Sequence, residues 1–192
     1  VAQVTNPPID SIREEVVMSL RCFIGPEGNL LETTPGQVRR LSLEHPVLSN
    51  QQLTDLSQMD HKGLRSCVID ITFAANQPDG FMEAVERICR EASQAIEDGY
   101  AFIILSDRNI SQSRIPLSAL IATGAVHQHL LNNELRSQIG IVVETGEARE
   151  VHHHCLLTGY GADAVNPYLA FEALWQVNKE GLLGDKYSTE DS

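Results

Sequence analysis

The sequence has few basic residues for its size. It carries 14 Lys and Arg against 26 Asp and Glu, which gives a formal net charge of −12 at pH 7. Phosphate groups attract a basic face, so this charge argues against binding to nucleic acid, and it disfavours a membrane surface on the same grounds. The composition is otherwise ordinary. A chain of 192 residues, 42% hydrophobic and 21% charged, can bury one good core as a soluble globular protein.

Long apolar runs and a recognisable leader are also missing. No run approaches the length that crosses a bilayer, and residues 1–8 lack the basic and then apolar layout of a signal peptide. Since the first residue is Val1 rather than Met, we expect the chain to be processed or cut from something longer. Four scattered cysteines form no CxxC pair, which favours reduced thiols in a cytosol-like compartment: Cys22, Cys67, Cys89 and Cys155.

The usual motifs of metal, phosphate and nucleophile sites are absent from the sequence. There is no HExxH, no GK[ST] and no GxSxG, and Gly159-Tyr160-Gly161 lacks the full GxGxxG pattern, so we predict a turn there. Histidines do gather, at His127, His129 and 152–154 beside Cys155, and zinc prefers such ligands. Consecutive helical residues point about 100° apart, so the three consecutive histidines cannot all face one ion. We predict packing or surface histidines and no metal site.

The second half of the chain has a regular alternation of strand and helix signals. Short runs rich in β-branched or apolar residues predict strands at 66–73, 101–105, 139–143 and 164–166. Helical spacing of apolar residues predicts helices at 76–98, 116–131, 148–157 and 167–177. In the first helix, Asn76 is the expected cap and Gly99 the stop. This order predicts an α/β fold in which parallel β-α repeats with right-handed crossovers form an open sheet or part of a barrel.

The first 65 or so residues are less regular. Ser11 and Glu14 have capping-box spacing at the start of a helix predicted over 11–20. The pattern then predicts short strands and one more helix, at 39–43, 46–48 and 51–59 respectively. At the other end, residues 178–192 are polar, and we expect a loosely held tail behind a domain that spans residues 1–177.

Acidic side chains follow the predicted strands. They lie at or just after the carboxyl ends, where α/β proteins usually place their sites: Asp70, Asp107, Glu144 and Glu147. One hypothesis makes Glu144 or Glu147 a general base of a self-contained α/β enzyme or small-molecule-binding domain. The other, which we prefer because position alone does not make a site, pairs these acids with arginines and ties the loops to a neighbouring domain. The arginines concerned are Arg108, Arg114 and Arg149.

Four blocks of residues, in a fixed order along the chain, carry a family resemblance. They are Val4–Glu14 (VTNPPIDSIRE) followed by Val17–Leu20, Leu105–Ile110 (LSDRNI), Glu144–His153 (ETGEAREVHH) and Gly159–Ala170 (GYGADAVNPYLA). Together they resemble the central domain of the large subunit of glutamate synthases, and they span nearly the whole chain. An ordered match of that extent does not arise by chance, so the chain is identified as a central-domain fragment of this family.

The resemblance implies a large flavoenzyme as parent, in the cytoplasm or in a plastid stroma. Such a parent makes two L-glutamate from L-glutamine and 2-oxoglutarate, using reduced ferredoxin or NAD(P)H, in glutamate biosynthesis and ammonia assimilation. An amidotransferase domain releases ammonia, which passes through a tunnel to an FMN-containing synthase barrel beside a 3Fe-4S cluster. The central domain joins these two domains, which are its implied partners, and its fold resembles a degenerate relative of the FMN barrel.

The catalytic parts of such a parent are missing from this sequence. Val1 is not a nucleophilic cysteine, the scattered cysteines match no cluster-binding run, and the FMN-barrel segment is absent. We therefore expect no catalytic residue, no cofactor and no activity in this chain alone. The one functional transfer from the family concerns Thr5 and Asn6, which the resemblance places near the ammonia tunnel as lining or positioning residues. The alternative is that Asn6 and Pro7 simply fix a turn before the helix.

Overall fold

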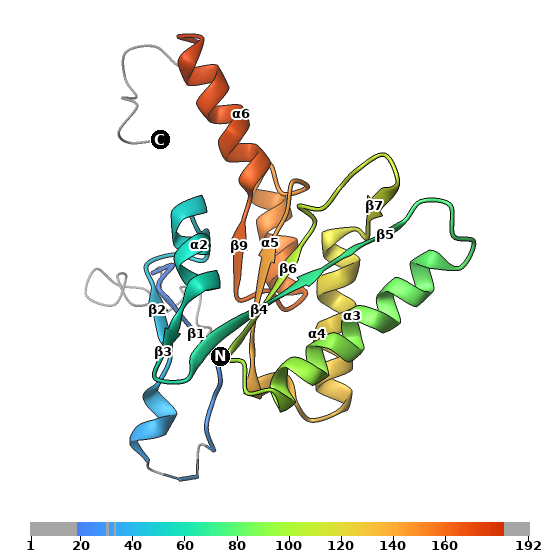
Figure 1. The fold of residues 1–192 in the computed structure, drawn as a ribbon. Helices are drawn as coiled ribbons and strands as arrows, with labels where there is room; N and C mark the ends of the chain where they lie inside the picture. The colour runs from blue at the N-terminus through green and yellow to red at the C-terminus, as the bar shows by residue number, and fades with distance from the viewer. Residues whose placement is uncertain (1–18, 30, 33, 183–192) are drawn as a thin grey trace, which may run out of the picture.

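Strands and helices alternate along most of the chain (Figure 1). The computed structural model describes residues 19–29, 31–32 and 34–182. Its strands are β1 (Cys22–Ile24), β2 (Leu41–Leu43), β3 (Asp60–His61), β4 (Leu64–Asp70), β5 (Thr72–Ala74), β6 (Phe102–Ser106), β7 (Arg114–Pro116), β8 (Gly140–Glu144) and β9 (Ala164–Asn166). Its helices are α2 (Asn50–Gln58), α3 (Gly80–Glu97), α4 (Ala119–Asn132), α5 (Val151–Gly159) and α6 (Tyr168–Lys179), with 3-10 turns η1 (Pro35–Val38) and η2 (Arg136–Gln138).

A five-stranded sheet forms the centre of the domain, in the order β3-β4-β6-β8-β9. β4, β6, β8 and β9 are parallel, and β3 runs antiparallel at one edge. At the other edge, the Leu48 N–H donates to the Val165 carbonyl (2.9 Å), and the Val165 N–H donates to the Pro46 carbonyl (2.8 Å). The predicted α/β fold with parallel β-α repeats is confirmed, and the sheet is open rather than closed into a barrel within the described residues.

Helices α3, α4 and α5 cover one face of this sheet (Figure 1). The central strands β6 and β8 send alternate side chains into that layer, among them Ile103, Leu105 and Ile141, which are fully buried. Small residues on α3, such as Ala84 and Ala92, let the helix lie close to the sheet. Each fully buried Ile or Leu stabilises the fold by about 1.5–3 kcal/mol relative to an exposed one.

The opposite face is covered by α2 and by the β1–β2 hairpin. Leu53 and Leu56 of α2 and Ile24 of β1 pack there against the inward side chains Phe102 and Ile104 of β6. Because both faces are covered, β6 is apolar along most of its length instead of alternating with polar residues, as expected for a buried parallel strand.

The run 66–73 forms two strands where the sequence predicts one. β4 ends at Asp70, whose Oδ1 accepts from the Thr72 N–H (2.8 Å), and β5 then pairs with β7 in a separate two-stranded sheet. Because β7 ends at Pro116, the predicted start of the next helix was also wrong, and α4 begins at Ala119. The run of β-branched residues hides this turn because a strand pattern does not show that the Asp70 side chain will bond the backbone two residues on.

The limits of α3 agree with the prediction at one end only. Gly99 follows the helix with φ +76°, as expected of a glycine stop. At the start, the N-cap is Asp79, not the predicted Asn76, because Pro78 precedes the helix in place of lying in its first turn.

The buried side of α4 differs from the predicted apolar stripe. The helix buries small or medium side chains, including Ala122, Thr123 and Val126. Ile121 and Leu131, two large apolar residues of the same helix, are each 47% exposed. Close packing on α3 favours small residues at the contact, so size decides the buried side here more than hydrophobicity does.

The first part of the chain is partly described. In α2 the Ser49 Oγ accepts from the Gln52 N–H (3.2 Å), and the Gln52 Oε1 accepts from the Ser49 N–H (2.8 Å), which completes a capping box. The helix predicted over 11–20 lies almost entirely outside the described residues, as does most of the predicted tail 178–192. Among the helices that the structure describes, none has the length and apolar character needed to span a bilayer.

Candidate functional site

The carboxyl ends of the parallel strands place a row of polar residues along one edge of the sheet. Asp70, Ser106, Glu144 and Asn166 end β4, β6, β8 and β9 and lie level with one another. We call these residues, with their neighbours in the adjoining segments, the carboxyl-edge cluster: Asp70, Ser106, Asp107, Arg108, Arg114, Glu144, Thr145, Glu147 and Asn166. The strand order thus brings all four predicted acids to the edge where α/β proteins bind ligands.

Asp107 is a buried carboxylate that joins two loops. It is 1% exposed. Its Oδ2 accepts from the Thr145 hydroxyl (2.7 Å) and from the Gly146 N–H (3.0 Å), and its own N–H donates to the Glu144 carbonyl (3.2 Å). Burial, together with the Asp107 carboxylate, raises the pKa of the Tyr168 hydroxyl far above its ordinary value. The contacts of Asp107 hold the β6 and β8 loops together.

Glu144 is neutralised by an arginine of the neighbouring loop. Its side chain is 14% exposed, and it accepts from the Ser106 hydroxyl (2.5 Å) and from Arg108 Nε (2.9 Å). The same guanidinium lies 3.8 Å from the ring centre of Tyr168 and reaches Glu172 at 3.4 Å. These contacts tie the Glu144 carboxylate to β6 and to the loop that follows it.

Asp70 is tied in the same way. Its Oδ2 accepts from Arg114 Nη2 (2.9 Å) and from the Asn109 amide (3.1 Å), while its Oδ1 accepts from the Thr72 N–H. Burial alone would raise the pKa of this carboxyl, but the hydrogen bonds from Thr72 and Asn109 and the charge of Arg114 outweigh it and lower the pKa. The acid is therefore ionised and paired across the ordinary pH range.

The predicted pairing of acids with arginines is confirmed for two of the three arginines. Arg108 pairs with Glu144 and Arg114 pairs with Asp70. For Arg149, the third arginine offered, no ion pair of its guanidinium is found within the described residues, and its backbone N–H donates to His153 Nδ1 (3.1 Å). Whether these loops contact a neighbouring domain stays a prediction.

The Glu147 carboxylate accepts hydrogen bonds at the start of α4 and borders a small pocket. Its Oε2 accepts from the Ala119 N–H (2.8 Å) and from the Ser118 hydroxyl (3.2 Å), so the carboxylate stabilises the positive end of that helix. A pocket of about 220 Å³ lies beside it, lined also by His153 and Leu157. This is a cavity at the carboxyl edge that includes a predicted acid.

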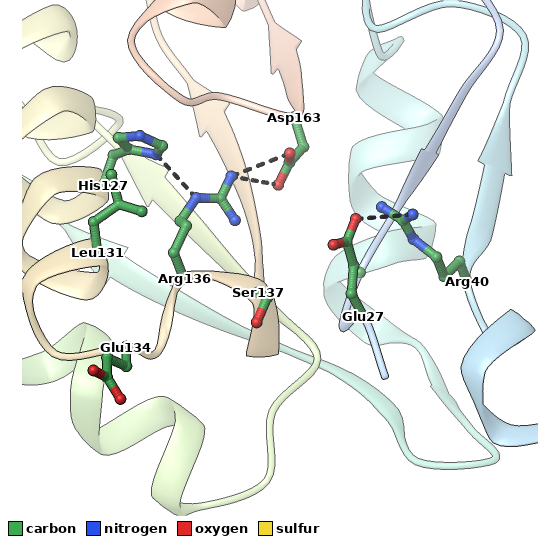
Figure 2. Close-up of a pocket in the computed structure, with 9 residues that line it drawn as sticks. Glu27, Arg40, His127, Leu131, Glu134, Arg136, Ser137 and Asp163 are labelled. Carbon is green, nitrogen blue, oxygen red and sulfur yellow. Dashed lines mark hydrogen bonds and ion pairs between the residues drawn. The ribbon is translucent and has the colours of Figure 1, made fainter. Parts of the chain in front are cut away.

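A second pocket, of about 390 Å³, lies at the opposite, amino-terminal edge of the sheet (Figure 2). There Arg136 stands between His127 and Asp163: its Nε donates to His127 Nδ1 (3.0 Å), and its Nη2 pairs with Asp163 (3.1 Å). Glu27 and Arg40 form a separate ion pair (3.1 Å) on the hairpin side. Arg136 also donates to two backbone carbonyls, so the arrangement binds its own segments together.

The histidines bond to separate groups of the protein. His129 Nε2 bonds the Ser93 hydroxyl (2.8 Å), and His153 Nδ1 accepts from the backbone of Arg149 and Glu150. Burial and the neighbouring His153 lower the pKa of His154. In the part of the chain that the structure covers, no three His, Cys, Asp or Glu side chains gather where they could hold a metal ion.

Several side-chain contacts at both edges carry no signal in the local sequence pattern. Arg136 and Asp163 are 27 positions apart, and no sequence motif links them. The local pattern around Asn166 predicts only the end of a short strand. Asn166 Nδ2 donates to the Leu48 carbonyl (2.9 Å), a partner 118 positions away. Thr5 and Asn6, the predicted tunnel residues, lie outside the described residues.

Comparison with known proteins finds similarity to a part of one set of enzymes. The family model described as glutamate synthase central domain matches residues 1–192. The chain is 50% identical over 185 residues to a glutamate synthase [NADH] of Schizosaccharomyces pombe, covering 95% of this chain and 9% of that protein. It is 45% identical over 186 residues to the glutamate synthase [NADPH] large chain of Bacillus subtilis, covering 97% of this chain and 12% of that protein. A ferredoxin-dependent glutamate synthase of Arabidopsis thaliana is 39% identical over 179 residues, covering 91% of this chain and 11% of that protein.

Proposed function

The chain belongs to the glutamate synthase central domain family, and we propose that it is the non-catalytic connector between the amidotransferase and FMN synthase domains of a glutamate synthase. It spans only 9–12% of the length of the relatives compared above. In this proposal the connector helps form the internal ammonia tunnel, holds no cofactor itself, and leaves FMN and the 3Fe-4S cluster to the rest of the parent.

The parent's reaction belongs to the same proposal. The relatives are named for NADH-, NADPH- and ferredoxin-dependent forms, so the electron donor differs among them. We expect the parent to convert L-glutamine and 2-oxoglutarate into two L-glutamate. Releasing ammonia at one site and consuming it at another requires a rigid connection between the sites, since misplacement by even about 1 Å can slow catalysis strongly.

The connector role rests on one observation: the charged side chains of the carboxyl-edge cluster are paired with one another or bonded to nearby donors. Asp70 and Glu144 are each paired with an arginine, and Asp107 is buried among hydroxyl and backbone donors. A catalytic acid or base needs a free lone pair or proton and a pKa close to the working pH. The cluster has the features of an edge that fixes its own loops.

Calorimetry tests this directly. FMN, 2-oxoglutarate and glutamine would each be titrated into the purified chain and, as a positive control, into the full-length parent. We expect heat of binding from the parent and none from the chain. Saturable binding of FMN or 2-oxoglutarate to the chain would contradict the connector role and show that the domain has a working site.

The tunnel role of Thr5 and Asn6 is tested in the full-length parent. With Asn6→Ala we expect more glutamine to be hydrolysed per glutamate formed, because ammonia escapes from a disturbed passage. Asn132→Ala, on the exposed side of α4, is the matched control and should leave the ratio unchanged. If Asn6→Ala also left this ratio unchanged, the tunnel role would be wrong, and the segment would only fix a turn before the helix.

One observation favours the second candidate, a small-molecule-binding domain. The pocket of about 220 Å³ brings Glu147 and His153 together at the carboxyl edge. Because His153 Nδ1 accepts from two backbone N–H groups, its Nε2 is left to donate. If calorimetry of the chain does show binding, Glu147→Gln should abolish it under this second proposal, whereas Glu97→Gln at the end of α3 should not.

A further inference from the structure

Helix α6 buries little of its apolar surface. Only Tyr168 of its 12 residues is buried. Leu174 is 53% exposed and Trp175 56% exposed, and Leu182 just beyond the helix is 70% exposed. In Figure 1 the helix leaves β9 and extends past the carboxyl edge, away from α3 and α4. A helix of this length is marginal by itself in water, and one with apolar residues on several sides is normally covered.

A groove of about 580 Å³ lies between α6 and the start of α2. Phe171, Leu174 and Trp175 line its α6 side, and Asn50 and Gln51 line its α2 side.

The α2 side of the groove is held in place by the fold. The buried Asn166 donates to Asn50 Oδ1 (3.0 Å), and Ser49 forms the capping box of α2. The α2 wall of the groove is therefore shaped before anything occupies the groove, which lowers the ordering cost of binding on that side.

We propose that the exposed apolar surface of α6, together with this groove, is the docking site for the domain of the parent polypeptide that adjoins α6. The inference rests on the proposed function, which makes this chain a connector within a longer protein. The relatives are much longer than the chain, which spans 9–12% of them. A domain attached by a short connection is present at an effective concentration in the millimolar range, so a modest apolar surface is enough to hold it.

A second copy of the chain is the weaker occupant on charge grounds. Each copy carries a formal net charge of −12, so two copies repel each other before any apolar contact forms. The adjoining domain should instead offer an apolar ridge for the groove and basic residues around it. It should also bring oxygen acceptors to Asn50 and Gln51, because the capping box already serves the Gln52 N–H and the N–H groups before it have no acceptor within the helix.

Photo-crosslinking in the full-length parent tests the proposal. The photoreactive amino acid p-benzoylphenylalanine replaces Trp175, an aromatic-for-aromatic exchange that leaves the buried core untouched. The matched control places it at Ile121, which is 47% exposed on α4. We expect position 175 to crosslink within the same polypeptide to a peptide outside residues 1–192, and position 121 to give only background.

Three results would overturn the proposal: crosslinks from position 175 only to residues within 1–192, crosslinks only to a second copy, or a yield no higher than at position 121. As a second measure, Leu174→Glu in the parent should speed protease cleavage within α6, whereas Ile121→Glu should not. Equal rates of protease cleavage within α6 in the two variants would also contradict docking. Neither readout depends on catalysis, so failure of docking is distinct from failure of the connector role, which would appear as ligand binding to the chain alone.

Discussion

At the scale of single residues, Asp107 is the side chain on which the carboxyl edge depends most. Asp107→Asn can keep an oxygen at the Oδ2 position, but its amide N–H₂ then takes the Oδ1 position and faces the Gly146 N–H, which lies 3.3 Å from Oδ1. A buried donor left unsatisfied costs roughly 1–3 kcal/mol, so we expect the free energy of unfolding to fall by that amount in urea titrations. The control is Asp55→Asn, which is exposed on α2. Its free energy of unfolding should stay within about 0.5 kcal/mol of that of the unsubstituted chain. Equal losses in both variants would contradict this account.

His127 makes stability depend on pH. Its Nδ1 accepts from Arg136, and burial, then the charge of Arg136, lower its pKa, although Asp163 acts in the opposite direction. A histidine with a lowered folded pKa contributes stability that is complete above the unfolded value of about 6.5 and is lost as pH falls below it. We expect the urea midpoint to drop between neutral pH and the lowered pKa, and His127→Gln to flatten that drop. The exposed His152→Gln should keep the wild-type pH profile, and an unaltered profile in His127→Gln would rule out this origin.

The residue scale also shows what the sequence could predict of the site. The acids after the strands were predictable because the carboxyl ends of parallel strands must share one edge, whatever the loops do. The pairing of Arg136 with Asp163 was not, because it depends on where α5 returns the chain to the sheet. Local patterns hold no signal for a contact of that kind.

At the scale of elements, the turn after α5 offers a matched pair of glycines. Gly161 has φ +112°, and a Cβ there would lie 2.2 Å from His127 Nδ1. Gly159, at the end of the helix, has nothing within 4 Å of the same position. We expect Gly161→Ala to destabilise the domain by roughly 1–3 kcal/mol, and Gly159→Ala to be neutral or to stabilise it by up to about 1 kcal/mol. Thermal unfolding of both variants checks this, and similar midpoints would show that the turn tolerates side chains.

The alternation of helices and strands was readable because each long element repeats its own period. Strand β9 and the end of α3 at Gly99 fall where the sequence predicts them. The β5–β7 pair was missed although β9 is equally short, because β9 is fully buried whereas β5 and β7 are partly exposed and pair only with each other. The buried side of α4 differs from the predicted one at Ile121 and Leu131, because close contact with α3 selects small residues there. Elements set by local spacing were predictable, and those set by a neighbour's shape were not.

At the scale of the whole molecule, the question is where the folding unit ends. The sequence predicts a domain over residues 1–177, but in the structure the last buried side chain of α6 is Tyr168. That ring contacts the Arg108 guanidinium at 3.8 Å, so it belongs to the carboxyl edge. The rest of α6 is half-buried at Ala170, Phe171, Val177 and Asn178, and it adds an exposed ion pair between Arg108 and Glu172, of a kind that contributes about 0–1 kcal/mol.

Two truncations separate folding from docking. A chain that ends at Phe171 keeps Tyr168, and we expect its free energy of unfolding to stay within about 1 kcal/mol of the 192-residue chain. A chain that ends at Pro167 loses the buried ring and should lose roughly 3 kcal/mol. Urea unfolding of the three chains measures both. If ending at Phe171 costs as much as ending at Pro167, then α6 is held by its own domain and its apolar surface needs no partner. If only the shorter chain is destabilised, the residues from 172 onward do nothing for folding, and their apolar side chains are explained by the neighbouring domain that we propose to dock on them.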